Sequence, residues 1–172
     1  MNNSELRDAF ERHSAVLFRY AFRMTGSESA AEDLVQECFL SLLRRPGSYD
    51  PSRGAVRAFL LGIARNLILM QWRKERSYEP LEDDSSMCLP LDLIDVERSE
   101  AIAKAVQSLP SLQREVLILA EYEELSLDEI VQITNAELGA VKSRLHRARQ
   151  NLRRLLAPLM ESKGALYGTD RS

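Results

Sequence analysis

The sequence predicts an all-α fold made of two small helical domains that are joined by an acidic, flexible linker. Apolar residues recur at alternating spacings of three and four over long stretches, which is the period of an α-helix. No useful length of chain alternates apolar and polar residues with the period of two that a strand requires. Seven glycines and six prolines in 172 residues are also few for a turn-rich all-β fold.

Three helices are expected in the N-terminal part, residues 1–76. The first has a continuous apolar face and ends at Gly26, because Gly readily adopts the left-handed conformation of a helix C-cap. The second begins near Ser29, since Ser29 and Glu32 have the spacing of a capping box. After a break that contains two prolines and two glycines, the third helix spans about 55–76.

An acidic segment, residues 77–97, separates these helices from the rest of the chain. It contains seven acids, no Lys or Arg, and two prolines, so we expect a linker whose simplest interpretation is a solvated spacer. The formal net charge of the whole chain is −3, which taken alone argues against a nucleic-acid partner. Without the linker, however, the remaining residues carry 23 bases and 19 acids, so the two flanking parts are basic on balance.

The C-terminal part, residues 98–160, contains a short helix, a tight turn and a long helix. Ser126 and Glu129 fit a capping box at the start of the short helix LDEIVQIT. Asn135 follows at the turn, because Asn tolerates the left-handed conformation better than most residues. The long last helix completes a helix-turn-helix, and residues 161–172 follow as a tail without an expected role.

The last helix carries six Lys or Arg residues between positions 138 and 154 and no acid. Such a helix can reach phosphates by charge and base edges with its polar side chains in the major groove. A basic helix considered alone is as well explained by a solvated surface as by DNA binding. Because this helix follows a capped helix and a turn, DNA binding is favoured. A weaker basic cluster near Trp72 is suited to single-stranded nucleic acid, although Trp72 fits a core position equally well.

The sequence contains no pattern that indicates catalysis or metal binding. His13 and His146 lie far apart, and neither is near a Cys at metal-ligand spacing. We therefore expect no enzyme activity, no cofactor, no metal and no small-molecule substrate. The chain has two cysteines, Cys38 and Cys88, which are too few for a disulfide framework. No stretch has the pattern of a signal peptide or of a membrane span. These features predict a cytoplasmic protein that does not insert into the membrane.

Two parts of the chain resemble the conserved domains of bacterial sigma factors of the sigma-70 family. Two stretches of this chain resemble the first conserved domain, region 2, namely FRMTGSESAAEDLVQECFLSLL and FLLGIARNLILMQWRKER. The helix-turn-helix of this chain resembles the second conserved domain, region 4, above all in its core VKSRLHRAR. With only these two domains and a short linker, the chain resembles an extracytoplasmic-function (ECF) sigma factor.

The resemblance implies binding to core RNA polymerase and recognition of promoter DNA. Residues 1–76 would bind polymerase and read and open the −10 element, and residues 98–160 would read the −35 element. Members of the family are commonly held inactive by an anti-sigma factor, so such a partner is also implied. The alternative is a stand-alone helix-turn-helix transcriptional regulator, which explains the C-terminal part equally well but leaves the region 2-like helices without a role.

Three groups of candidate residues match the family's motifs. The −35 group lies on the last helix and consists of Lys142, Ser143, Arg144, His146, Arg147 and Arg149. The −10 group lies on the third helix and consists of Arg65, Asn66, Met70, Arg73, Lys74 and Arg76. The polymerase-binding group lies in the DLVQE motif of the second helix and consists of Asp33, Leu34, Gln36 and Glu37.

The chain departs from the family pattern at several of these places. Met70 stands where an acidic or amide residue is common, and Met cannot hydrogen-bond a base edge strongly. In the turn, Asn135 replaces a Gly and Thr134 an apolar residue, and Ala140 replaces a Thr at the start of the last helix. The resemblance also places the acidic linker near the polymerase active site, where its acids would mimic the charge of RNA.

Overall fold

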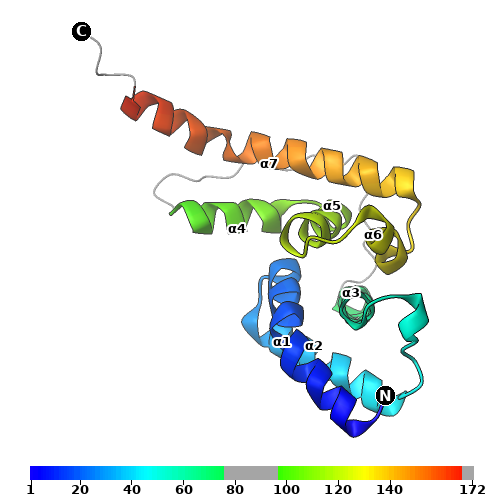
Figure 1. Cartoon of the computed structure of the whole chain (residues 1–172). Helices are drawn as coiled ribbons and strands as arrows, with labels where there is room; N and C mark the ends of the chain where they lie inside the picture. The colour runs from blue at the N-terminus through cyan, green and yellow to red at the C-terminus, as the bar shows by residue number, and fades with distance from the viewer. Residues whose placement is uncertain (76–96, 168–172) are drawn as a thin grey trace.

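The computed structural model describes residues 1–75 and 97–167, with side chains described through residue 161. All regular structure within these ranges is helical, which confirms the expected all-α class (Figure 1). No helix in this described part is long and apolar enough to cross a membrane. Arg76, Cys88, residues 77–96 of the linker and the end of the tail lie outside the described residues.

Local capping signals fix where the N-terminal helices begin and end. The first helix ends at Gly26, which has the predicted left-handed conformation with a φ of 70°. The second helix is capped by Ser27, whose side chain accepts a hydrogen bond from the Ala30 N–H, so the predicted cap at Ser29 is wrong by two residues. The elements are α1 (Asn3–Thr25), α2 (Glu28–Arg44), the 3₁₀ turn η1 (Pro51–Arg53) and α3 (Val56–Glu75).

The C-terminal half contains the expected helix-turn-helix. Ser126 and Glu129 form the predicted capping box, and Asn135 ends the short helix with a φ of 54°. The last helix contains Pro158 and continues past residue 160, where the sequence predicts the tail to begin. The elements are α4 (Arg98–Ser108), α5 (Ser111–Leu117), the π-helical turn η2 (Ile118–Tyr122), α6 (Leu127–Thr134) and α7 (Leu138–Tyr167).

The two helical domains pack against each other. Helix α1 contacts α4, α5 and η2, and α3 contacts α6. Figure 1 accordingly shows α3 below α6 and one end of α1 below α5. Buried side chains of both domains, such as Leu17 of the N-terminal domain and Leu109 of the C-terminal domain, belong to one continuous apolar cluster. The position of α3 between the rest of its own domain and α6 determines which of its side chains reach the surface.

Candidate nucleic-acid interface

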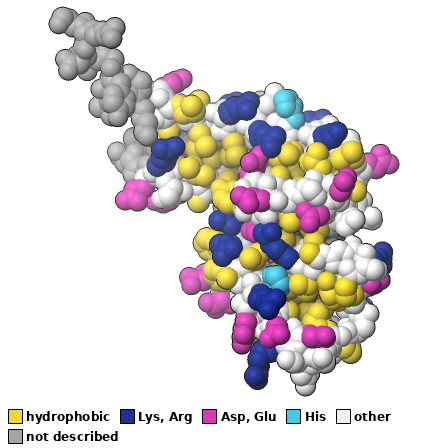
Figure 2. Space-filling model, viewed as in Figure 1, with side chains coloured by type: hydrophobic (Ala, Val, Ile, Leu, Met, Phe, Trp, Pro, Cys, Tyr) yellow, Lys and Arg dark blue, Asp and Glu magenta, His cyan; other side chains and the backbone are white. Residues whose placement is uncertain are grey.

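Helix α7 presents its basic side chains to solvent because its apolar side chains are used for packing. Val141, Leu145, Ala148 and Leu155 are buried, and α7 contacts α4, α5 and α6. Figure 2 shows Lys and Arg side chains and one His along the upper edge of the molecule, over α7. In the preceding turn, the Thr134 hydroxyl donates to the Ile130 carbonyl at 2.7 Å, so this buried polar group is satisfied.

The residues of the −35 group differ in exposure and in their contacts. Arg144 is half-buried, and its charge favours the ionised form of buried Glu115 of α5. The Arg149 guanidinium donates to the Glu121 carboxylate, with Nε 2.7 Å from Oε1, so an acid already partly neutralises it. The exposed residues of the group are Lys142, Ser143, His146, Arg147 and Arg149.

The −10 group on α3 divides into covered and exposed members. Asn66, Arg73 and Lys74 are exposed, and Met70 is 50% exposed. The Arg65 side chain is only 12% exposed, because its guanidinium donates to the Glu115 carboxylate of the C-terminal domain. The structure therefore brings Asn66, Met70, Arg73 and Lys74 to the surface and holds Arg65 against α5.

Glu115 is itself an unusual residue for its position. Its side chain is 2% exposed and lies next to the long apolar run of α5 and η2. Burial raises the pKa of the Glu115 carboxyl, and the charges of Arg65 and Arg144 oppose this change. Burial, with the nearby Glu115 charge, also raises the pKa of the Tyr20 hydroxyl. Arginines from two different helices therefore offset part of the cost of burying the Glu115 charge.

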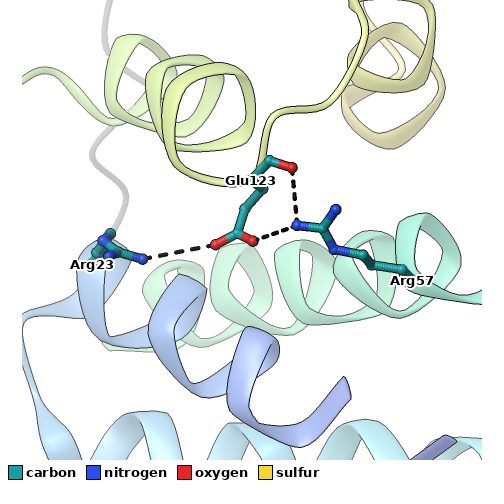
Figure 3. Close-up of polar contacts among 3 residues, drawn as sticks. All are labelled: Arg23, Arg57 and Glu123. Atoms are coloured by element: carbon teal, nitrogen blue, oxygen red, sulfur yellow. Dashed lines mark hydrogen bonds and ion pairs between the residues drawn. The ribbon is translucent and has the colours of Figure 1, made fainter. Parts of the chain in front are cut away.

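A second buried acid, Glu123, lies between two arginines of the N-terminal domain (Figure 3). Arg57 Nη2 donates to Glu123 Oε2 at 2.8 Å and to the Glu123 carbonyl oxygen at 2.9 Å. Arg23 Nη1 lies 3.8 Å from Glu123 Oε1. Sequence reasoning missed both buried acids. Glu115 directly precedes the apolar run VLILA, which was an available signal, whereas no such signal marks Glu123.

The polymerase-binding group on α2 is partly at the surface. Asp33 and Gln36 are exposed, whereas Glu37 is half-buried and accepts a hydrogen bond from Arg44 Nη1 at 2.7 Å. Leu34 is 4% exposed and packs in the core, so its side chain is not available to a partner in this structure. Apolar side chains are nevertheless exposed nearby, namely Phe10, Leu40 and Leu43. Polar groups beside exposed apolar ones suit a protein partner.

Neither a metal-binding group nor a reactive thiol is found among the side chains that the structure describes. No group of three or more His, Cys, Asp or Glu residues there is placed to hold a metal ion. Cys38 is fully buried, and burial raises the pKa of its thiol to about 12, which suppresses the reactive thiolate. Trp72 is half-buried and packs against the core, in agreement with the interpretation of Trp72 as a core residue.

Comparison with known proteins agrees with this arrangement. Residues 9–78 match the family model of sigma-70 region 2, and residues 99–152 match that of sigma-70 region 4. The ECF RNA polymerase sigma factor SigL of Mycobacterium tuberculosis is 33% identical over 159 residues, which cover 90% of each chain. SigW of Bacillus subtilis, also an ECF sigma factor, is 30% identical over 88% of this chain and 89% of its own.

Two further relatives are consistent with these matches. The ECF sigma factor SigE of Mycolicibacterium smegmatis is 34% identical over 85% of this chain, which spans 59% of the length of that relative. The chain shares its fold with the sigma factor RpoE of Bartonella quintana, whose structure was solved in complex with the anti-sigma factor NepR. The TM-score is 0.72 at 24% identity, and the match covers 89% of this chain and 97% of RpoE. The chain therefore belongs to the ECF subfamily of the sigma-70 family.

Proposed function

We propose that the two basic helices of this ECF sigma factor divide promoter recognition between them, α7 reading the −35 element and α3 the −10 element. Sigma factors bind core RNA polymerase and direct it to promoters, and the polymerase supplies the catalysis. The observation that carries the proposal is the outward basic face of α7, which follows a capped helix and a left-handed turn. Such an arrangement supports the proposal because the second helix of a helix-turn-helix typically enters the major groove.

The first turns of α7 are the part suited to base contacts. In a helix-turn-helix, the N-terminal residues of the second helix approach the base edges. Lys142, Ser143, His146 and Arg147 are exposed in this part of α7. Arg153 and Arg154 lie more than a turn further along, are also exposed, and are suited to phosphate contacts that position the helix.

The exposed residues of the −10 group form one strip on α3. Asn66, Met70 and Arg73 are spaced by four and three, so they share a face of the helix, and Lys74 lies beside them. Asn66 offers an amide for hydrogen bonds to a base, and Met70 offers an apolar surface against which a base can pack. Capture of an unstacked base would offset an opening cost of a few kcal/mol. Arg73 and Lys74 supply phosphate contacts at the basic end of the helix.

The exposed surface of α2 is the proposed contact with core polymerase. Asp33, Gln36 and Glu37 supply acidic and amide groups, and Phe10 and Leu40 supply exposed apolar area nearby. A polar rim around apolar side chains is the composition expected of a protein interface. Because Leu34 is buried, we assign it to the core that supports this surface. An anti-sigma partner is proposed as well, by analogy with the RpoE complex, without a location on the chain.

Reconstituted transcription tests the proposal. Purified chain added to core polymerase should give specific initiation from a promoter at which core polymerase alone gives none. Arg147→Ala should weaken initiation that depends on the −35 element while leaving polymerase binding intact. Arg7→Ala, which removes an exposed arginine at the start of α1, should leave both unchanged. Strong DNA binding without polymerase association would refute the proposal and favour the stand-alone regulator.

A further inference from the structure

A groove with a volume of about 690 Å³ lies between the C-terminal half of α1 and helix α4. The two helices are in contact, and Figure 1 shows α4 extending past the end of α1. We call this space the α1–α4 groove. Small-molecule sites in proteins have volumes of about 300–1,000 Å³ and mostly apolar walls. The α1–α4 groove has such a volume, and the function proposed above makes no use of it.

Aromatic and aliphatic side chains line the α1–α4 groove without being covered by the rest of the chain. The rings of Phe18 and Phe22 stack on α1 with their centres 6.2 Å apart, and Phe22 is 43% exposed. Tyr122 of η2 is 37% exposed, and Ile102 of α4 is half-buried. All four line the groove. Contiguous exposed apolar surface of this kind marks a binding site more often than isolated apolar residues do. These side chains suit a ligand with an apolar body.

Two arginines give the α1 side of the groove a positive charge. Arg19 and Arg23 are four residues apart, so their side chains lie on the same face of the helix. Arg19 is exposed and forms no ion pair with any side chain that the structure describes. Arg23 Nη1 lies 3.8 Å from Glu123 Oε1, which is beyond hydrogen-bond distance, so this guanidinium can still donate to a ligand. Glu100 and Lys104 also line the groove, but they pair with each other at 3.4 Å.

Hydrogen bonds between the two domains fix the end of α1 beside α4. Gln107 Nε2 of α4 donates to the Arg23 carbonyl, and Arg114 Nη1 of α5 donates to the Met24 carbonyl at 2.7 Å. Carbonyl groups in the last turn of a helix have no partner within the helix, so these donors satisfy groups that need one. The walls of the groove are therefore held in place before a ligand binds. A preformed site loses less conformational freedom on binding than a flexible one.

We propose that the α1–α4 groove binds an amphiphilic anion, namely a free fatty acid. Its alkyl chain lies against Phe18, Phe22 and Ile102, and its carboxylate accepts hydrogen bonds from Arg19 and Arg23. A hydrogen bond between a guanidinium and a carboxylate is among the strong ones, because both partners are charged. The arrangement thus matches each half of the ligand to one part of the groove.

The size of the groove favours a small ligand over a partner protein. Its α1 wall runs from Phe18 to Gly26, which is about two turns of helix. A standard protein–protein interface uses about 20–30 residues on each side, which is more than line this groove. An alkyl chain needs only a narrow apolar channel with a cation at its edge, and the groove supplies both.

Isothermal titration calorimetry with sodium decanoate tests the proposal on the full chain. At neutral pH, and below the concentration at which decanoate forms micelles, the chain should bind one decanoate. Decanol has the same alkyl chain without the charge and should bind about tenfold more weakly, because it cannot form the charge-assisted hydrogen bonds. Equal affinity for the two compounds, or no binding of decanoate, would overturn the proposal.

Two variants test the location of the site. Ala103 is exposed on α4 and lines the groove, so Ala103→Phe should fill the space and abolish decanoate binding. Arg19→Gln should weaken decanoate binding about tenfold and leave decanol binding unchanged. The matched controls are Ala15→Phe and Arg12→Gln, which make the same changes at exposed positions of α1 outside the groove. Circular dichroism establishes that all four variants are folded. Decanoate binding by Ala103→Phe as tight as that by Ala15→Phe would overturn the assignment.

Two further measurements distinguish other occupants of the groove. Binding of the chain to phosphatidylglycerol vesicles without binding of free decanoate would overturn the proposal in favour of a membrane surface. Analytical ultracentrifugation detects a second copy of the chain, and a dimer that Ala103→Phe dissociates, without decanoate binding, would likewise overturn it. None of these experiments uses DNA or polymerase. Failure of the fatty acid site would therefore leave the proposed sigma function standing, and failure of initiation would leave the fatty acid site standing.

Discussion

Helices α7 and α3 are both basic, but they lie in different surroundings. The apolar face of α7 packs on its own domain, so most of its basic residues reach solvent. Helix α3 lies between its own domain and α6, and its arginines are divided between two faces. Arg57 and Arg65 meet buried acids, whereas Arg73 is exposed. A basic pattern in a sequence therefore identifies a candidate DNA surface without showing whether that surface is accessible.

The largest expected effect separates the two faces of α3. Leu61→Ala removes a fully buried side chain from the inward face and should lower the free energy of unfolding by about 2–5 kcal/mol. Met70→Ala changes a half-exposed side chain on the outward face and should alter stability by less than about 0.5 kcal/mol. Urea denaturation of the two variants measures the difference. Equal losses of stability would show that α3 does not have the orientation described.

The next effect distinguishes α7 from α3 in DNA binding. Arg147→Ala should weaken binding of the chain to duplex DNA that carries its −35 element by about 1–3 kcal/mol, the usual value for a contact to a base. Arg57→Gln should leave this duplex affinity unchanged, because Arg57 lies on α3 and is paired with Glu123. Fluorescence anisotropy measures both. An equal loss of duplex affinity in Arg147→Ala and Arg57→Gln would show a general charge effect rather than a specific role of α7.

A smaller effect concerns the pH dependence of stability. Burial raises the pKa of Glu115, so the folded state holds this proton more tightly than the unfolded state does. Its contribution to the free energy of unfolding is therefore complete below the ordinary pKa of 4.5 and declines as the pH rises through the raised value. Glu115→Gln cannot ionise, so its stability relative to the wild type should rise as the pH increases above 4.5. Parallel pH profiles in urea denaturation would contradict this.

Much of the fold could be predicted because its signals are local. Gly26, Asn135 and the pair Ser126 and Glu129 mark helix ends within a few residues of sequence, and all four act as predicted. The spacing of apolar residues likewise predicted the buried face of α7. The start of α2 was misplaced because Ser27 and Ser29 are equally good caps by type, and the backbone uses the earlier one.

The contact between the domains could not be predicted in the same way. Arg65 and Glu115 are 50 residues apart in sequence, and Arg57 and Glu123 are 66 apart. No periodicity or spacing relates residues at such distances, since their pairing depends on how α5 and the connection after η2 pack on α3. Leu34 illustrates the same point, because a motif can include a residue whose side chain belongs to the core.

The most direct test of the difference between α7 and α3 is the distance between them before and after polymerase binds. Fluorophores are attached through cysteines at Gln71 of α3 and Gln150 of α7, which are both exposed, in a chain that carries Cys88→Ser. Cys38 stays unlabelled, because it is buried and its thiol has a pKa of about 12. We predict efficient energy transfer in the free chain and a clear loss of transfer when core polymerase is added. Transfer that is equally low in the free chain, or unchanged by polymerase, would contradict the account.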